Sequence, residues 1–151
     1  MAIAEASEHT TRGTDDRAMM DAYIRDLIER GAFARHFTPD VTFRVEGTDL
    51  AASGAANVEQ TIRLMHEQLF DAHPVLKSLL VDGHRAAVEA EFIGTHTGEF
   101  AGIPATGRHV AVPYSVVYDL RDGKIAALRI YLPMNALVAQ LTASEAAPAA
   151  K

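Results

Sequence analysis

The chain has 151 residues, of which 48% are hydrophobic and 23% are charged, so its composition is that of a folded globular domain. Fourteen lysine and arginine residues against twenty aspartate and glutamate residues give a net charge of −6, which disfavours nucleic acid and anionic membrane surfaces as partners. The absence of cysteine excludes disulfides, thiolate nucleophiles and cysteine-based metal sites. Because neither a signal peptide nor a long apolar run is present, we expect a cytoplasmic protein without a membrane anchor.

The first half of the chain is predicted to be mainly helical. Residues 1–13 lack periodicity and are expected to be flexible, and a helix is expected to start at Thr14 and to stop at Gly31, which supplies a left-handed residue. A helical turn at 33–37, a strand at 41–45 and a loop at 46–56 follow. Asn57 with Gln60 resembles a capping box for a second helix that ends near Phe70. Its apolar stripe consists of Val58, Ile62, Met65 and Leu69.

The second half of the chain changes to the period-two pattern of strands. Strands are predicted at 75–81, 85–97, 109–120 and 124–132, before a short helix at 133–140 and a flexible tail at 143–151. On the strand 85–97, alternation places Phe92 and His96 on the same inward, apolar face. Helices followed by an antiparallel meander give one α+β domain, over residues 14–142.

The Asp122-Gly123 pair is the strongest hairpin signal in the chain. Counting back from this turn places Arg121 opposite Lys124 and Ser115 opposite Ile130. One face then carries the predicted inward residues Ser115, Val117, Leu128, Ile130 and Leu132. The other face carries Tyr114, Val116, Tyr118, Arg129 and Tyr131, which we interpret as an outer dimer surface because tyrosine and arginine are enriched in interfaces.

The run GTHTGEFAGIPATGRHV at 94–110, the segment VVYDLRDGKI and the closing Gln140-Leu141 resemble the SnoaL-like polyketide cyclase family of the nuclear transport factor 2-like superfamily. The resemblance covers roughly residues 14 to 142. It implies a cone formed by a curved antiparallel sheet wrapped around helices, with a deep apolar pocket and a homodimer. The superfamily includes cyclases, ketosteroid isomerase, epoxide hydrolases and proteins that only bind, so the fold does not choose a chemistry.

Two residues are candidates for catalysis. His96 matches the histidine of the family motif, and a neutral imidazole can move a carbon-bound proton. Tyr23, on the inner stripe of the first helix, corresponds to a tyrosine that donates a hydrogen bond to substrate in related isomerases. The alternative interpretation is a buried structural histidine and a tyrosine that packs in the core.

The chain departs from the family pattern on its last strand. Active relatives carry aspartates there, whereas this chain has Ile130 and Pro133 at the matching positions. Glu46 or Asp49 is a possible substitute carboxylate. The remaining histidines show no metal-binding spacing, although His66 is placed where it can approach the pocket rim. No phosphate-binding glycine loop is present, so we expect neither a metal nor another cofactor.

The expected function is that of a cofactor-independent cyclase or isomerase acting on a hydrophobic, polyketide- or terpenoid-like small molecule. His96 and Tyr23 are its expected catalytic residues. The alternative is a binding protein without chemistry, and an epoxide hydrolase is a third, weaker hypothesis. The residues expected to bind the small molecule are Phe92, Ser115, Val117, Leu128, Ile130, Glu46 and Met65.

Overall fold

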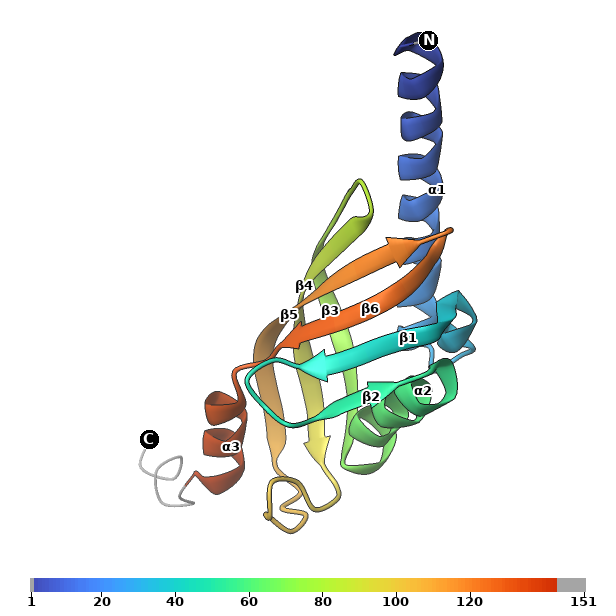
Figure 1. Ribbon diagram of the computed structural model, residues 1–151. Coiled ribbons are helices and arrows are strands. Elements are labelled where there is room, and N and C mark those ends of the chain that lie inside the picture. Colours follow the sequence, from blue (N-terminus) through green and yellow to red (C-terminus); the bar gives the residue numbers. More distant parts are fainter. Residues whose placement is uncertain (1, 144–151) are drawn as a thin grey trace.

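The computed structural model describes the backbone of residues 2–143 (Figure 1). A six-stranded sheet with strand order β2-β1-β6-β5-β4-β3 forms its centre. The helical elements are α1 (Ala2–Ile28), the 3-10 turn η1 (Phe33–His36), α2 (Ala55–Arg63), the π-helical turn η2 (Leu64–Gln68) and α3 (Met134–Thr142). The strands are β1 (Phe37–Val45), β2 (Ala51–Ser53), β3 (Phe70–Asp82), β4 (Arg85–His96), β5 (His109–Arg121) and β6 (Lys124–Tyr131).

The architecture confirms the predicted α+β class, with a curved sheet that packs on helices. The sheet is mixed instead of purely antiparallel, because β1 pairs with β6 in parallel while the other neighbours are antiparallel. A parallel pair needs a crossover connection. Here the chain leaves β1 through β2 and α2 and returns through the β3–β6 meander before β6 pairs with β1.

Several predicted boundaries were wrong. Helix α1 begins at Ala2 instead of Thr14, and its left-handed residue is Arg30, with φ of 57°, instead of Gly31. Gly54, not Asn57, is the N-cap of α2. Strand β2 lies in the predicted loop, and β3 starts already at Phe70. Apart from Ala143, the predicted flexible tail lies outside the described residues.

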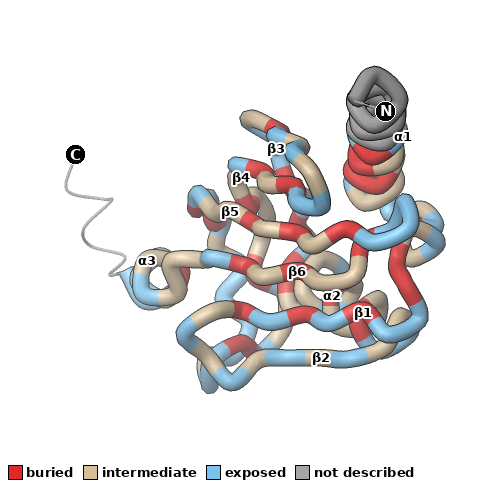
Figure 2. The backbone as a smooth tube through the Cα atoms, turned by 45° about the horizontal axis from the view of Figure 1, so that its top comes forward, coloured by how far each residue is buried: buried red, intermediate tan, exposed pale blue. Residues whose placement is uncertain are grey.

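Alternation along the central strands separates a buried face from a solvent face (Figure 2). The buried face of β4 includes Val88, Phe92 and His96, as predicted. One core cluster joins α1 and α2 to the sheet, and a second joins Phe70 and Phe92 to α3 through Leu137. No helix among the described residues is long and apolar enough to cross a membrane.

The β5–β6 hairpin has the predicted turn but not the predicted register. Arg121 pairs with Lys124, and positive φ angles of 53° at Asp122 and 74° at Gly123 fit a type I′ turn. After Leu120 pairs with Ile125, Asp119 pairs with Ala127, so one extra residue bulges from β6. A bulge of one residue exchanges the two faces of one strand relative to its partner.

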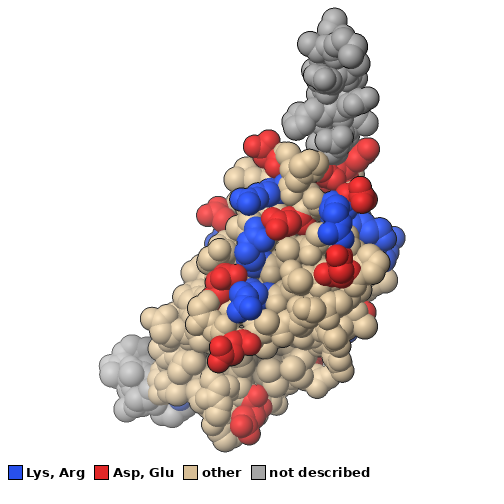
Figure 3. Space-filling model, viewed as in Figure 1, with Lys and Arg blue, Asp and Glu red and all other residues tan. Residues whose placement is uncertain are grey.

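The bulge therefore corrects the predicted faces of β5. Val116 lies opposite Ile130, and Tyr118 lies opposite Leu128, on the buried side. Ser115 and Val117, predicted to face inward, instead share the outer side with Arg129 and Tyr131. On this outer side Arg129 forms a bidentate ion pair with Asp119, with both N–O distances 2.9 Å. Basic and acidic side chains are interspersed on the surface shown in Figure 3.

Candidate functional site

A cavity of ≈ 70 Å³ lies between η2, the end of α2 and the inner face of the sheet. Its volume exceeds the roughly 15 Å³ that one water molecule needs but is below the roughly 300 Å³ of a typical ligand pocket. In this conformation it therefore accommodates a small molecule or a fragment of a larger one. His66 and Tyr114 are the lining residues with polar side chains, but the surface that faces the cavity is apolar. The lining consists of Phe43, Val45, Ile62, Met65, His66, Phe92, Tyr114, Ile130 and Leu132.

The hydrogen bonding of His66 defines which of its ring nitrogens carries the proton. Nδ1 lies 2.8 Å from the carbonyl oxygen of Ile62, and a carbonyl can only accept, so Nδ1 carries the hydrogen. Nε2 is buried and has no hydrogen-bond partner among the described residues. Burial is the main cause that lowers the pKa of His66, and the positive charge of Arg30 adds to it. His66 therefore keeps an unprotonated nitrogen with a free lone pair, buried in the cavity wall.

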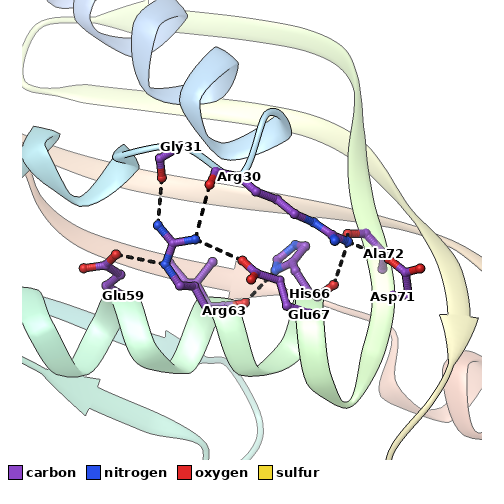
Figure 4. A network of polar contacts seen from close by, with 9 residues as sticks. Arg30, Gly31, Glu59, Arg63, His66, Glu67, Asp71 and Ala72 are labelled. Carbon is purple, nitrogen blue, oxygen red and sulfur yellow. Dashed lines mark hydrogen bonds and ion pairs between the residues drawn. The ribbon is translucent and has the colours of Figure 1, made fainter.

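The π-helical turn positions His66. The backbone N–H of Leu69 donates to the carbonyl of Leu64 at 2.9 Å, an i to i−5 bond that inserts an extra residue into the turn. Figure 4 shows how two arginines fasten this segment to its neighbours. Arg63 donates to Glu59, Glu67 and the carbonyl of Gly31, at 2.9, 3.0 and 2.8 Å.

Tyr114, on β5, lines the same cavity. Burial raises the pKa of its hydroxyl, so the phenol keeps its proton at any physiological pH and is available as a donor. Tyr23 and Tyr118 are also deeply buried, and the pKa of each is raised by burial and by electrostatic interaction with Tyr114. Three phenols thus lie close enough to influence one another, and the rings of Tyr23 and Tyr118 have centroids 6.0 Å apart.

The two sequence-predicted catalytic residues are outside the cavity lining. Tyr23 is 1% exposed and packs in the core against Phe33 and Phe37. His96 is fully buried, and its Nδ1 accepts a hydrogen bond from the backbone N–H of Thr106 at 3.1 Å. The neutral form of His96 must then carry its hydrogen on Nε2, because Nδ1 uses its lone pair on Thr106.

His96 also holds the loop between β4 and β5. Its backbone N–H donates to the carbonyl of Arg108, and its carbonyl accepts from Gly107, both at 2.9 Å. Its ring packs against Phe70, with centroids 5.2 Å apart, and Phe70 in turn packs against Phe92 at 5.2 Å. The two phenylalanine rings connect His96 to the cavity wall.

The structure brings together only part of the predicted binding set. Phe92, Met65 and Ile130 line the cavity, whereas Leu128 lies in the adjacent core. Ser115 and Val117 face outward because of the β6 bulge. Glu46 follows Val45 at the end of β1 and interacts electrostatically with Arg129, whereas Val45 faces the cavity.

No carboxylate lines the cavity, and the apolar Ile130 stands where the family resemblance leads one to expect an aspartate. In the described part of the chain, no three potential metal ligands come together. From the sequence, His66 was placed only near the pocket rim and Tyr114 on the outer face, so neither was predicted to be catalytic. Signals for both exist, because His66 follows the buried Ile62 by one helical turn, and Tyr114 alternates with Val112 and Val116.

Comparison with known proteins assigns the architecture. A family model described as SnoaL-like polyketide cyclase matches residues 17–141. No curated protein sequence matches the chain.

Among solved structures, a candidate SnoaL-like polyketide cyclase from Jannaschia sp. CCS1 superposes with a TM-score of 0.77 at 20% identity, covering 87% of this chain and 94% of the other. A candidate ketosteroid isomerase from Kribbella flavida DSM 17836 gives 0.63 at 20% identity, covering 80% and 79%. An epoxide hydrolase of the LEH-like type from M. tuberculosis gives 0.68 at 14% identity, covering 91% and 97%. At these identities the three similarities establish the fold.

Proposed function

Because the chain belongs to the SnoaL-like polyketide cyclase family, we propose that it is a cofactor-independent cyclase or isomerase that moves a proton on a small, neutral carbonyl compound. His66 is the base and Tyr114 is the hydrogen-bond donor. The Nε2 atoms of His66 and His96 are both buried without a partner among the described residues, and the observation that carries this proposal is that His66 is the one that lines the apolar cavity. A buried polar atom without a partner is uncommon in native proteins and calls for an explanation.

The reaction begins when Nε2 of His66 removes a proton from the carbon next to the substrate carbonyl. The electron pair of the broken C–H bond forms a C–C double bond, and the carbonyl oxygen becomes an enolate oxygen. The Tyr114 hydroxyl donates a hydrogen bond to this oxygen, which stabilises charge that is present mainly in the transition state. Because the phenol stays neutral, it remains a donor throughout.

The second half of the reaction returns the proton. In an isomerase, whose substrate carries a β,γ C–C double bond, the His66 imidazolium gives the proton to the γ-carbon of the dienolate, and the double bond moves into conjugation with the carbonyl. In a cyclase, the enolate carbon attacks a second carbonyl of the same molecule, a C–C bond forms, and the imidazolium protonates the new alkoxide. Both routes conserve protons and electrons and need no redox partner.

The cavity also favours a neutral, apolar substrate. Its lining offers no cationic side chain to a phosphate or carboxylate group, and burying an unpaired charge there is strongly unfavourable. Phe43, Phe92 and Ile130 instead offer apolar contact area. These features support a hydrophobic, polyketide- or terpenoid-like compound, of which the cavity encloses the reacting end.

The test is deuterium exchange at the α-carbon of cyclopentanone in D₂O, followed by NMR. We expect the protein to accelerate exchange and His66→Gln to reduce the acceleration by about 10²-fold or more, the usual contribution of a general base. His96→Gln is the matched control, because it removes the other histidine with a buried, unpaired Nε2. Loss of exchange in His96→Gln with retention in His66→Gln would return the base role to His96.

A binding protein without chemistry is the second candidate, and the replacement of the expected carboxylate by Ile130 supports it. It predicts that cyclopentanone binds, seen as saturation-transfer signals, without accelerated exchange. An epoxide hydrolase remains the third candidate and is disfavoured, since no carboxylate that could activate water lines the cavity.

We further propose a cytoplasmic homodimer formed through the outer sheet face. Tyr131 is 48% exposed there and adjoins Ser115, Val117 and Arg129. Sedimentation of the wild-type protein and of Tyr131→Glu tests the dimer, and equal masses corresponding to one chain in both samples exclude it.

A further inference from the structure

The structure also points to how His66 is held in place, an inference that rests on the proposed function. Arg30 lies just beyond the end of α1, far from His66 in sequence, and its side chain crosses to η2 and β3 (Figure 4). A single nitrogen, Nη2, contacts the carbonyl oxygen of His66 at 3.0 Å, that of Ala72 at 3.1 Å and the carboxylate of Asp71 at 2.7 Å. Two of these three partners belong to the backbone.

We infer that Arg30 is a positioning residue, which fixes the π-helical turn against β3 and thereby holds the His66 ring in the wall of the cavity. The carbonyl that Arg30 binds belongs to the same residue as the proposed base. A shift of that backbone therefore moves the imidazole directly. Small displacements of a reacting group cause large losses of rate.

The backbone of Arg30 provides independent support. The N–H of Arg30 donates to Leu27 and that of Gly31 donates to Asp26, at 3.1 and 2.7 Å, which is the hydrogen-bond pattern of a Schellman helix end. The left-handed position of this motif is usually glycine, yet here it is Arg30, with φ of 57°. The glycine of this segment, Gly31, follows Arg30, so the strained left-handed position is occupied by a residue with a long side chain.

The charge of Arg30 acts on His66 as well. Arg30 and His73 lower the pKa of His66 beyond the effect of burial, whereas Glu67 and the hydrogen bond to Ile62 raise it. Arg30 thus helps to keep the proposed base unprotonated. Asp71, whose side chain is 69% exposed, pairs with the same Nη2 of Arg30, so Asp71→Asn removes the carboxylate charge without removing either backbone contact and serves as the control.

The experiment compares Arg30→Gln, Arg30→Lys and Arg30→Gly with Asp71→Asn. The first readout is the tautomer and pKa of the His66 ring, measured by ¹⁵N NMR. We expect Arg30→Gln to raise the pKa of His66 and to lower kcat for cyclopentanone exchange by about 10-fold or more, with little change in KM. Arg30→Lys keeps a cation with three donors and should restore most of both properties.

Arg30→Gly separates positioning from folding. Glycine relieves the left-handed strain, so the variant should stay folded and yet lose rate like Arg30→Gln. An unchanged His66 spectrum with wild-type kcat in Arg30→Gly overturns the inference, as does a loss of rate in Asp71→Asn equal to that in Arg30→Gln. If His66→Gln does not affect exchange, the base assignment fails, while the NMR readout still decides whether Arg30 holds His66.

Discussion

The imidazole of His66, which is partly buried and has a buried Nε2, makes the stability of the protein depend on pH. Burial lowers the pKa of His66 in the folded state, whereas the ring has a pKa of about 6.5 in the unfolded chain. Below pH 6.5, the unfolded state therefore binds more protons at this residue than the folded state does. The free energy of unfolding is unaffected by His66 above the unfolded pKa and falls as the pH decreases from 6.5 toward the folded pKa.

The size of the effect follows from proton linkage. One proton bound only by the unfolded state lowers the free energy of unfolding by about 1.4 kcal/mol per pH unit. Between pH 7.5 and pH 5.5, His66 should therefore reduce stability by up to about 1.4 kcal/mol, provided that the folded protein keeps the ring neutral over this range. A typical domain is stable by only about 5–15 kcal/mol, so the loss is measurable.

The assay is urea denaturation of the wild type and of His66→Met at both pH values. Methionine removes the titrating group but retains an apolar side chain beside Met65 and Phe92. The lost hydrogen bond to Ile62 changes the free energy of unfolding of the variant by the same amount at both pH values. The stability difference between wild type and variant therefore changes with pH only through the titration of His66. Parallel pH profiles, or a wild type that gains stability relative to His66→Met at pH 5.5, would refute the reasoning.

Three further predictions concern single residues. Tyr114→Phe should lower kcat for cyclopentanone exchange by about 10²-fold with the fold intact by circular dichroism, because it removes the donor to the enolate. Gly94→Ala should destabilise the protein by about 3 kcal/mol in urea denaturation, since the new Cβ would lie 2.4 Å from both the Asp71 carbonyl oxygen and Ala72 Cβ. Gly102→Ala is the control: its Cβ meets no atom within 4 Å, so the positive φ alone should lower the free energy of unfolding by about 1 kcal/mol. Ile130→Asp places a carboxyl group in the apolar cavity, so in an enzyme it should increase the exchange rate, whereas in a specialised binder it should weaken cyclopentanone binding measured by NMR.

Much of the fold could be predicted because local patterns and tertiary packing agree. The alternation on β4 identifies Phe92 and His96 as buried without any knowledge of neighbouring strands. Asp122-Gly123 specifies a type I′ turn through local sterics alone. The parallel pairing of β1 with β6 is different, because nothing within either strand encodes a partner so distant along the chain.

The register of β5 and β6 shows where counting residues fails. Ile125 and Leu128 are both buried although they are separated by an odd number of positions, which a regular strand cannot achieve. The bulge in β6 resolves this conflict. In the sequence of β5, the even-numbered residues from Val110 to Leu120 form the more apolar face, which is the face that the structure buries. The hydrophobic pattern was thus a better guide to the faces than the distance from the turn.

His66 and His96 show why the candidate base was harder to predict than the fold. Sequence supplies two imidazoles near the inner face of the sheet, and their chemical difference arises from the backbone group that each one meets. At His66 the partner is a carbonyl, which requires hydrogen on Nδ1 and leaves the lone pair of Nε2 beside the cavity. At His96 the partner is an N–H group, which occupies the lone pair of Nδ1 and leaves the ring holding a loop. Since the last strand contributes Ile130 in place of a carboxylate, acid/base chemistry in this cavity depends on a base from the helical side, and the orientation of one carbonyl in α2 selects it.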